Sequence, residues 1–145
     1  MKLRLAQNKD IKFILNLYNQ NIIEKKFFSR KKVNLEDHKI WFSRNIKKKM
    51  FYVALLKKRI GYIRFDQINK KNLSVSIAID RKYKRKGYGT KILLTALNKE
   101  KISKFNVLAK IKKGNLISKN FFLNSGFKFL KDQYYIFKQK QNIKI

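Results

Sequence analysis

The sequence predicts one mixed domain of the α/β or α+β class, with helices packed around a single sheet. The chain has 145 residues, which is the usual size of one domain. Apolar residues make up 44% of it, which is enough for a sizeable core. Segments that alternate apolar and polar residues are interleaved with segments of helical periodicity. This order is typical of helices that cover the faces of one sheet.

The N-terminal half is expected to contribute two helices and four strands. Ile11, Ile14 and Tyr18 recur at helical spacing, and Asn34 is a good N-cap for a second helix. Residues 21–34, between these helices, look irregular. Apolar runs and alternation predict the strands. The expected helices are 10–20 and 35–46, and the expected strands are 3–6, 51–56, 60–65 and 73–79.

The C-terminal half is expected to add two helices and three strands. A turn with two glycines, at residues 87–90, precedes the first helix, and Gly126 ends the second as a C-cap glycine. The expected helices are 90–97 and 115–125, and the expected strands are 105–111, 127–129 and 134–137. The tail from Lys138 is polar, and we expect it to be frayed.

The chain is strongly basic, with 38 Lys and Arg against 8 Asp and Glu and a net charge of +30. One explanation is a polyanionic partner such as nucleic acid. The other is codon-driven composition, because Lys, Asn, Ile and Phe dominate while Arg, the better phosphate ligand, is scarce. The lysines are spread along the whole chain, which favours the second explanation. We therefore do not expect a nucleic-acid partner, although the positive field attracts small anions.

Several kinds of site are excluded by residues that the chain lacks. It has no Cys, which excludes disulfides, thiolate metal sites and a Cys nucleophile. Its single His cannot build a His-based cluster, so we expect no metal. No apolar run approaches the roughly 20 residues of a transmembrane helix, and the first residues do not look like a signal peptide. We expect a cytoplasmic protein without a membrane partner.

A short glycine motif lies between a predicted strand and a predicted helix. Residues 84–89 read Lys-Arg-Lys-Gly-Tyr-Gly. The two glycines let backbone N–H groups turn toward phosphate oxygens, and the helix adds the positive end of its dipole. The motif is not a Walker loop, and it lacks the third glycine of the dinucleotide fingerprint. It predicts an anion-binding turn, and on its own it leaves an ordinary glycine loop as the alternative.

A second motif opens the expected helix at 115–125. It consists of Asn115, Ser118, Phe122, Gly126 and Phe127. Together with the glycine motif, it resembles the GNAT superfamily of acyl-CoA-dependent N-acetyltransferases. The resemblance covers the chain from Leu3 to Phe137 and keeps the family's order of elements. One departure is mild, because Lys84 stands where the family has Arg or Gln.

The resemblance implies both a fold and a donor substrate. The implied fold is a GNAT-like domain over residues 1–145, with a mixed, mostly antiparallel central sheet of about six to seven strands, about four flanking helices and splayed central strands. The implied co-substrate is acetyl-CoA, whose pantetheine arm would lie between the splayed strands. The residues implied to bind it are Ile77, Ala78 and Ile79 through their backbone, Lys84, Arg85, Lys86, Gly87, Tyr88, Gly89 and Thr90 around the pyrophosphate, and Asn115 and Phe122 beside the pantetheine.

Two catalytic groups that are frequent in the resembling family are missing here. The family often has a carboxylate on the strand that corresponds to residues 72–79, but this segment contains no acid. The family often uses a Tyr to reprotonate the CoA thiolate, and this chain has Phe122 at the matching position. Water or another residue must therefore move the protons.

We expect the general base among three residues, His38, Glu36 and Glu24. His38 titrates near neutral pH without a large shift, and Glu36 lies next to it in the same helix start. Glu24 lies in the irregular segment that, by the resemblance, lines the acceptor pocket. The alternative is that Glu36 and His38 only form a solvated helix start.

The acceptor is expected to be a small amine, and an anionic one would suit the positive field. Residues 28–42 resemble the acceptor side of bacterial acetyltransferases that act on nucleotide-linked amino sugars in the pseudaminic-acid pathway. Transfer would occur by direct attack in a ternary complex. Two other functions stay open: acetylation of protein N-termini or lysines, and nucleic-acid binding by a GNAT-like protein without catalysis. A homodimer is also left open.

Overall fold

The computed structural model describes residues 1–23 and 34–139, and they follow the predicted order of elements. The strands are β1 (Lys2–Leu5), β2 (Phe51–Leu55), β3 (Arg59–Gln67), β4 (Asn72–Ile79), β5 (Asn106–Lys110), β6 (Lys128–Lys131) and β7 (Tyr134–Phe137). The α-helices are α1 (Ile11–Ile23), α2 (Leu35–Lys47), α3 (Tyr88–Leu97), α4 (Glu100–Ser103) and α5 (Leu116–Asn124). Short 3-10 helices, η1 and η2, occupy Asn8–Asp10 and Arg81–Tyr83.

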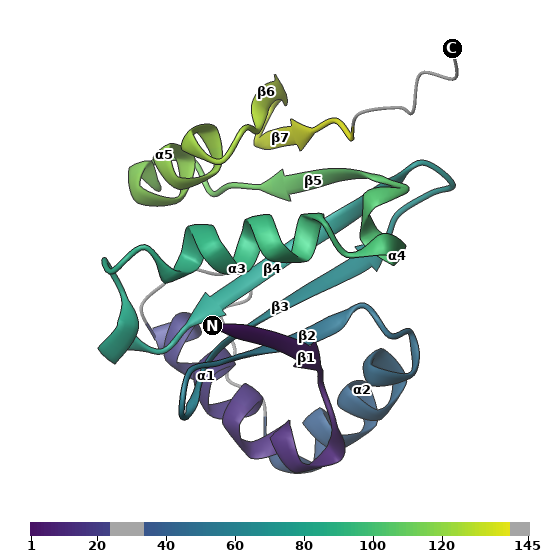
Figure 1. Cartoon of the computed structure of the whole chain (residues 1–145), viewed down its shortest axis with the longest axis vertical. Coiled ribbons are helices and arrows are strands. Elements are labelled where there is room, and N and C mark those ends of the chain that lie inside the picture. Colours follow the sequence, from purple (N-terminus) through teal and green to yellow (C-terminus); the bar gives the residue numbers. More distant parts are fainter. Residues whose placement is uncertain (24–33, 140–145) are drawn as a thin grey trace.

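All seven strands belong to one sheet in the order β1-β2-β3-β4-β5-β7-β6 (Figure 1). Neighbouring strands are antiparallel except for β4 and β5, which run parallel. A parallel pair needs a crossover connection, which α3 and α4 supply. The predicted mixed, mostly antiparallel sheet is therefore confirmed.

The helices cover the two faces of the sheet unequally. α3 lies across one face over β4 (Figure 1), where its residues Ile92, Leu93 and Ala96 are buried in the main core. On the other face, Ile14 of α1 and Phe42 of α2 pack in a second core against β2 and β3. No described helix covers the part of this second face that β5 and β7 form.

A buried carboxylate ties the N-terminal strand to the start of the helical layer. The Asp10 side chain is fully buried, and its oxygens accept hydrogen bonds from Arg4 at 2.7 and 2.8 Å and from Arg59 at 3.1 Å. The Gln7 backbone N–H donates a further bond at 2.8 Å. Burial alone would raise the pKa of Asp10, but these hydrogen bonds outweigh it and lower the pKa.

The differences from the predicted elements are local. α4 is not predicted, because four residues are too few for a periodic pattern; it forms where Ile102 is completely buried. The closing hairpin begins at Lys128 rather than Phe127, since Gly126 has a φ of +98° and Phe127 packs in the main core. Among the described helices, none combines the length and apolar character needed to cross a bilayer.

Candidate active site

The sheet splits between its two parallel strands. β4 and β5 pair only at Asn72–Asn106, Leu73–Val107 and Ser74–Leu108. Beyond this point β4 continues to Ile79 paired with β3, and β5 stays paired with β7 on its other edge. A gap therefore opens beside the C-terminal half of β4, as the predicted splayed central strands require.

The backbone of β4 alternates between β3 and this gap. The Asp80 N–H donates to the Ile60 carbonyl of β3 at 2.8 Å, and the Lys71 carbonyl accepts from Asn106 on the β5 side at 2.9 Å. Successive residues of a strand direct their N–H and C=O groups to opposite sides. Ile77 and Ile79 therefore face the gap, together with Val75. Ala78 is turned the other way.

The position of Ala78 corrects one expectation about the donor site. Ala78 is opposite Tyr62 in the β3–β4 register, and its side chain is buried in the second core. Its backbone groups are directed to β3 and do not reach the gap. Ile77 and Ile79 keep the expected geometry.

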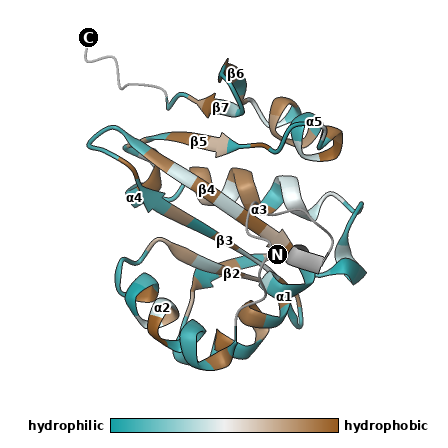
Figure 2. Cartoon of the chain, turned by 180° about the vertical axis from the view of Figure 1, so that it is seen from behind, coloured by the Kyte–Doolittle hydropathy of each residue, from teal (hydrophilic) through white to brown (hydrophobic). Residues whose placement is uncertain are grey.

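The glycine motif forms the turn between η2 and α3, at the end of β4. Arg85 and Gly87 both take left-handed backbone conformations, with φ of +62° and +82°, and Gly87 is the N-cap of α3. The first helical bond of α3 runs from the Lys91 N–H to the Gly87 carbonyl at 3.3 Å. The N–H groups of residues 88–90 precede this bond, so they have no acceptor within the helix. The turn is largely hydrophilic (Figure 2) and can accept an anion at this helix end.

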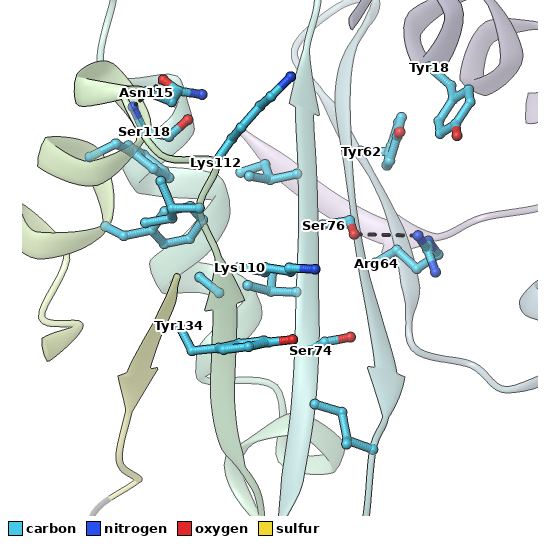
Figure 3. A pocket seen from close by; sticks show the side chains of 17 residues that line it. Tyr18, Tyr62, Arg64, Ser74, Ser76, Lys110, Lys112, Asn115, Ser118 and Tyr134 are labelled. Carbon is cyan, nitrogen blue, oxygen red and sulfur yellow. Dashed lines mark hydrogen bonds between the residues drawn. The ribbon is translucent and has the colours of Figure 1, made fainter. Parts of the chain in front are cut away.

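A cavity of about 600 Å³ lies where the strands separate (Figure 3). Its walls come from β3, β4, β5, β7 and α5, with Tyr18 from α1. Arg64 and Ser76 lie on one wall, and Lys110 and Tyr134 reach toward β4 from the other. Of the described residues that line the cavity, Arg64, Lys110 and Lys112 are cationic and none is Asp or Glu.

Arg64 is held in the cavity by contacts with three side chains. Its guanidinium carbon lies 4.9 Å from the centre of the Trp41 ring, in a cation–π contact. Nη1 forms an ion pair with Asp66, and Nη2 is 3.4 Å from the Ser76 hydroxyl. Nε is buried and has no hydrogen-bond partner among the described residues.

Asn115 and Phe122 meet the cavity from α5. The Asn115 side-chain oxygen accepts from the Ser118 N–H at 3.1 Å, so this residue is the N-cap of α5. Phe122 is buried, with its ring centre 5.0 Å from those of Phe121 and Phe127. Both residues line the cavity, where the sequence places them.

The two described base candidates, His38 and Glu36, are not brought to the cavity. His38 is 3% exposed; its ring stacks on Trp41 at 5.3 Å between centres and is tilted against Phe42 at 5.8 Å. Glu36 is exposed at the start of α2 and pairs with Lys39 at 3.3 Å. Neither lines the cavity, so the geometry does not support a base role for them. Glu24 lies outside the described residues.

Sequence reasoning missed the polar residues of β3 and β7. Tyr62, Arg64 and Asp66 alternate with the apolar Ile63 and Phe65, so they share one face of β3. This polar alternation in a central strand is the signal that could have marked a site. No comparable signal distinguishes Tyr134, because its place at the cavity depends on the register between β5 and β7.

The family profile of the acetyltransferase (GNAT) domain matches residues 1–128. The match spans most of the sequence and all of the site described above except Tyr134. The chain therefore belongs to the GNAT acetyltransferase family. Among curated protein sequences, none matches this chain.

Solved structures share the fold at low sequence identity. YncA from Salmonella typhimurium, solved with its cofactor acetyl-CoA, has a TM-score of 0.83 at 17% identity, over 100% of this chain and 97% of that one. A ribosomal-protein-alanine N-acetyltransferase from Brucella melitensis has a TM-score of 0.80 at 17% identity, over 94% of this chain and 96% of that one. Spermidine N-acetyltransferase from Vibrio cholerae, in complex with CoA and spermine, has a TM-score of 0.75 at 18% identity, over 93% of this chain and 90% of that one.

Proposed function

We propose that this protein transfers the acetyl group of acetyl-CoA to the primary amine of a small anionic acceptor, by direct attack in a ternary complex. The observation that carries the proposal is the early end of the β4–β5 pairing at Ser74 and Leu108. β4 continues along the gap to Ile79, paired only with β3 on its other edge. Pantetheine has two amides, and it can add to such an edge as an extra strand would.

The glycine motif is suited to the other end of the donor. An arm that runs along Ile77 and Ile79 leads to the turn at 84–90. The N–H groups of the first turn of α3 are directed to that turn, and Lys84, Arg85 and Lys86 add positive charge. A pyrophosphate is favoured there by both the backbone donors and the cations.

The acceptor side is positively charged along its described wall. It lies on the face of the sheet that α1 and α2 leave uncovered, where Arg64 and Lys110 line the cavity. Lysine-rich peptides would be repelled by this charge, whereas an amine with a carboxylate or phosphate would be attracted. A nucleotide-linked amino sugar is one acceptor of this kind.

The chemistry requires proton movement at two atoms. The amine nitrogen attacks the thioester carbonyl carbon and loses a proton, while the CoA sulfur leaves and gains one. The described cavity wall contains no carboxylate or His, so a water molecule is the simplest proton acceptor. Burial raises the pKa of Tyr62, so its hydroxyl stays protonated and cannot act as a base. The Tyr134 hydroxyl, directed toward Ser74 (Figure 3), is the proton donor that we propose for the sulfur.

Two measurements on the purified protein test the proposal. Calorimetry with acetyl-CoA should give saturable binding in the micromolar range. Release of free thiol should then be measured with a panel of primary amines that includes amino acids, amino-sugar nucleotides, polyamines and peptides. Thiol release with anionic small amines supports the proposal. Absence of acetyl-CoA binding, or turnover with peptides alone, contradicts it.

A further inference from the structure

We infer that Arg64 is the residue that recognises the acceptor, by binding its anionic group through the Nε–Nη2 edge of the guanidinium. The inference rests on the proposed function, because it assigns a substrate contact within the same site. It separates two anion sites: one for the phosphates of the donor at the glycine turn, and one for the acceptor on β3.

The first step of the argument is that Arg64 is held in one orientation. Its planar group lies on the Trp41 ring at 4.9 Å, and its Nη1 is occupied by Asp66. The side chain is only 19% exposed. A guanidinium fixed on both sides loses little conformational freedom when it binds a ligand, which makes it a better recognition group than a mobile lysine.

The second step is that one edge of the guanidinium is not fully paired by the described residues. Nε is buried without a partner among the described residues, and the contact from Nη2 to the Ser76 hydroxyl is long at 3.4 Å. Nε and Nη2 lie on the same side of the planar group. A carboxylate or phosphate placed beside Ser76 can accept from both atoms at once, which is the strongest geometry available to Arg.

The third step is the distance from this edge to the reacting centre. Arg64 is directly opposite Ser76 in the β3–β4 register, and Ser76 is next to Ile77, which faces the gap. Neighbouring strands are about 4.8 Å apart, so the anion would lie roughly one strand spacing from the donor arm. The site therefore suits a compact acceptor in which the amine and the anion are a few bonds apart. Amino acids and phosphorylated amino alcohols have this form, and a nucleotide-linked amino sugar has its first phosphate somewhat further away.

Trp41 gives a readout that does not depend on turnover. It is the only Trp of the chain, and Arg64 lies on its ring. Its fluorescence should be titrated, with CoA present, against phosphoethanolamine and β-alanine and against their neutral partners ethanolamine and β-alaninamide. UDP-linked and free amino sugars form a third pair, which distinguishes compact acceptors from nucleotide-linked ones.

Three variants make the test specific. In Arg64→Gln, we expect anion binding to weaken by about tenfold or more, because a charge-assisted pair of hydrogen bonds is lost. Lys110→Gln removes the same charge from the opposite wall of the cavity, and Lys71→Gln removes it from the exposed β3–β4 turn. Lys71→Gln should keep the wild-type fluorescence response, and Lys110→Gln should weaken it by less than Arg64→Gln does. Acetyl-CoA binding by Arg64→Gln should stay near the wild-type value, which shows that the variant is folded.

The inference is overturned if the wild-type protein responds equally to the anionic and neutral partners, or if the response survives in Arg64→Gln. It is also overturned if Lys110→Gln alone abolishes the response. In each of these cases acetyl-CoA binding is unaffected and acetyl transfer to a small amine stands. An equal response to partners without an anionic group would also remove the anionic acceptor from the proposed function. A wild-type protein that does not bind acetyl-CoA overturns both.

Discussion

Gly89 lies so close to Ile79 that a Cβ atom at residue 89 would be 2.9 Å from the Ile79 Cδ1 atom and 3.1 Å from the ring of Phe121. The glycine therefore lets the first turn of α3 approach both β4 and α5. We expect Gly89→Trp to push these elements apart and to weaken acetyl-CoA binding by about tenfold or more, since overpacking of this kind costs about 1–3 kcal/mol. Calorimetry with acetyl-CoA measures the loss.

The matched control for this change is Thr95→Trp, which adds the same side chain to an exposed position of α3. It should leave acetyl-CoA affinity within error of the wild-type value. Equal affinities for wild type and Gly89→Trp would show that the turn does not hold the donor.

Asn115 has two parts that can be tested separately. Its oxygen caps α5, and its amide nitrogen is the group that we propose to contact pantetheine. Asn115→Asp keeps the cap, so stability should be retained, while Asn115→Ala should lose about 1 kcal/mol. Both should bind acetyl-CoA more weakly. Thermal unfolding and calorimetry together give the two quantities.

Asn124→Asp is the charge control for Asn115→Asp, because it adds the same charge at the exposed end of the same helix. If Asn115→Asp binds acetyl-CoA as tightly as Asn124→Asp does, the amide nitrogen is not a donor contact and Asn115 is a cap alone.

His38 should make the stability of the protein depend on pH. Burial lowers the pKa of His38 below 6.5 and outweighs its hydrogen bond with the Ile11 backbone. The unfolded chain takes up the proton first, so the free energy of unfolding should fall as the pH drops from about 6.5 toward the folded pKa. Urea unfolding between about pH 7.5 and pH 5 measures this slope.

His38→Phe keeps an aromatic ring between Trp41 and Phe42 but removes the titrating group. Because His38 is the only His of the chain, the slope in this pH range should flatten in the variant. An unchanged slope would mean that another group titrates there and that His38 is not the cause.

Asp10 should be a strong structural determinant. Asp10→Asn leaves Arg4 and Arg59 without their shared carboxylate, and we expect a loss of about 2–3 kcal/mol in the free energy of unfolding. Because the pKa of Asp10 is lowered from 3.8, its contribution is present above that pH and is lost as the pH falls through the folded value. Glu36→Gln, at an exposed ion pair, should change stability very little. Equal losses of unfolding free energy in Asp10→Asn and Glu36→Gln would contradict a special structural role for Asp10.

Much of the fold could be predicted from the sequence because its signals are local. The alternation of residues 73–79 and the helical spacing of Ile11, Ile14 and Tyr18 are visible within each segment. The turn at Gly87 and the N-cap Asn115 were predicted for a similar reason, since a turn and an N-cap are determined by adjacent residues. The helix after the turn begins at Tyr88, two residues before the expected start at Thr90.

The rest of the site depends on contacts between distant segments. The direction of the Ala78 backbone is set by its register with Tyr62, and no property of residues 77–79 alone reveals it. Arg64 becomes a recognition group only because Trp41, from a helix earlier in the chain, lies under it. His38 resembled an exposed helix start, but it is buried and has a hydrogen bond with the backbone of Ile11, which is 27 residues earlier in the chain.

The split in the sheet also has a mechanical consequence. Strands β1–β4 and strands β5–β7 are joined across the split by only three register pairs, all at the start of β4. A pantetheine arm bound in the gap would connect these two parts of the sheet at the end where they are not paired. Amide hydrogen exchange at residues 75, 77 and 79 should therefore slow when acetyl-CoA is added. The relative motion of the two parts of the sheet about Ser74 and Leu108 should be reduced as well.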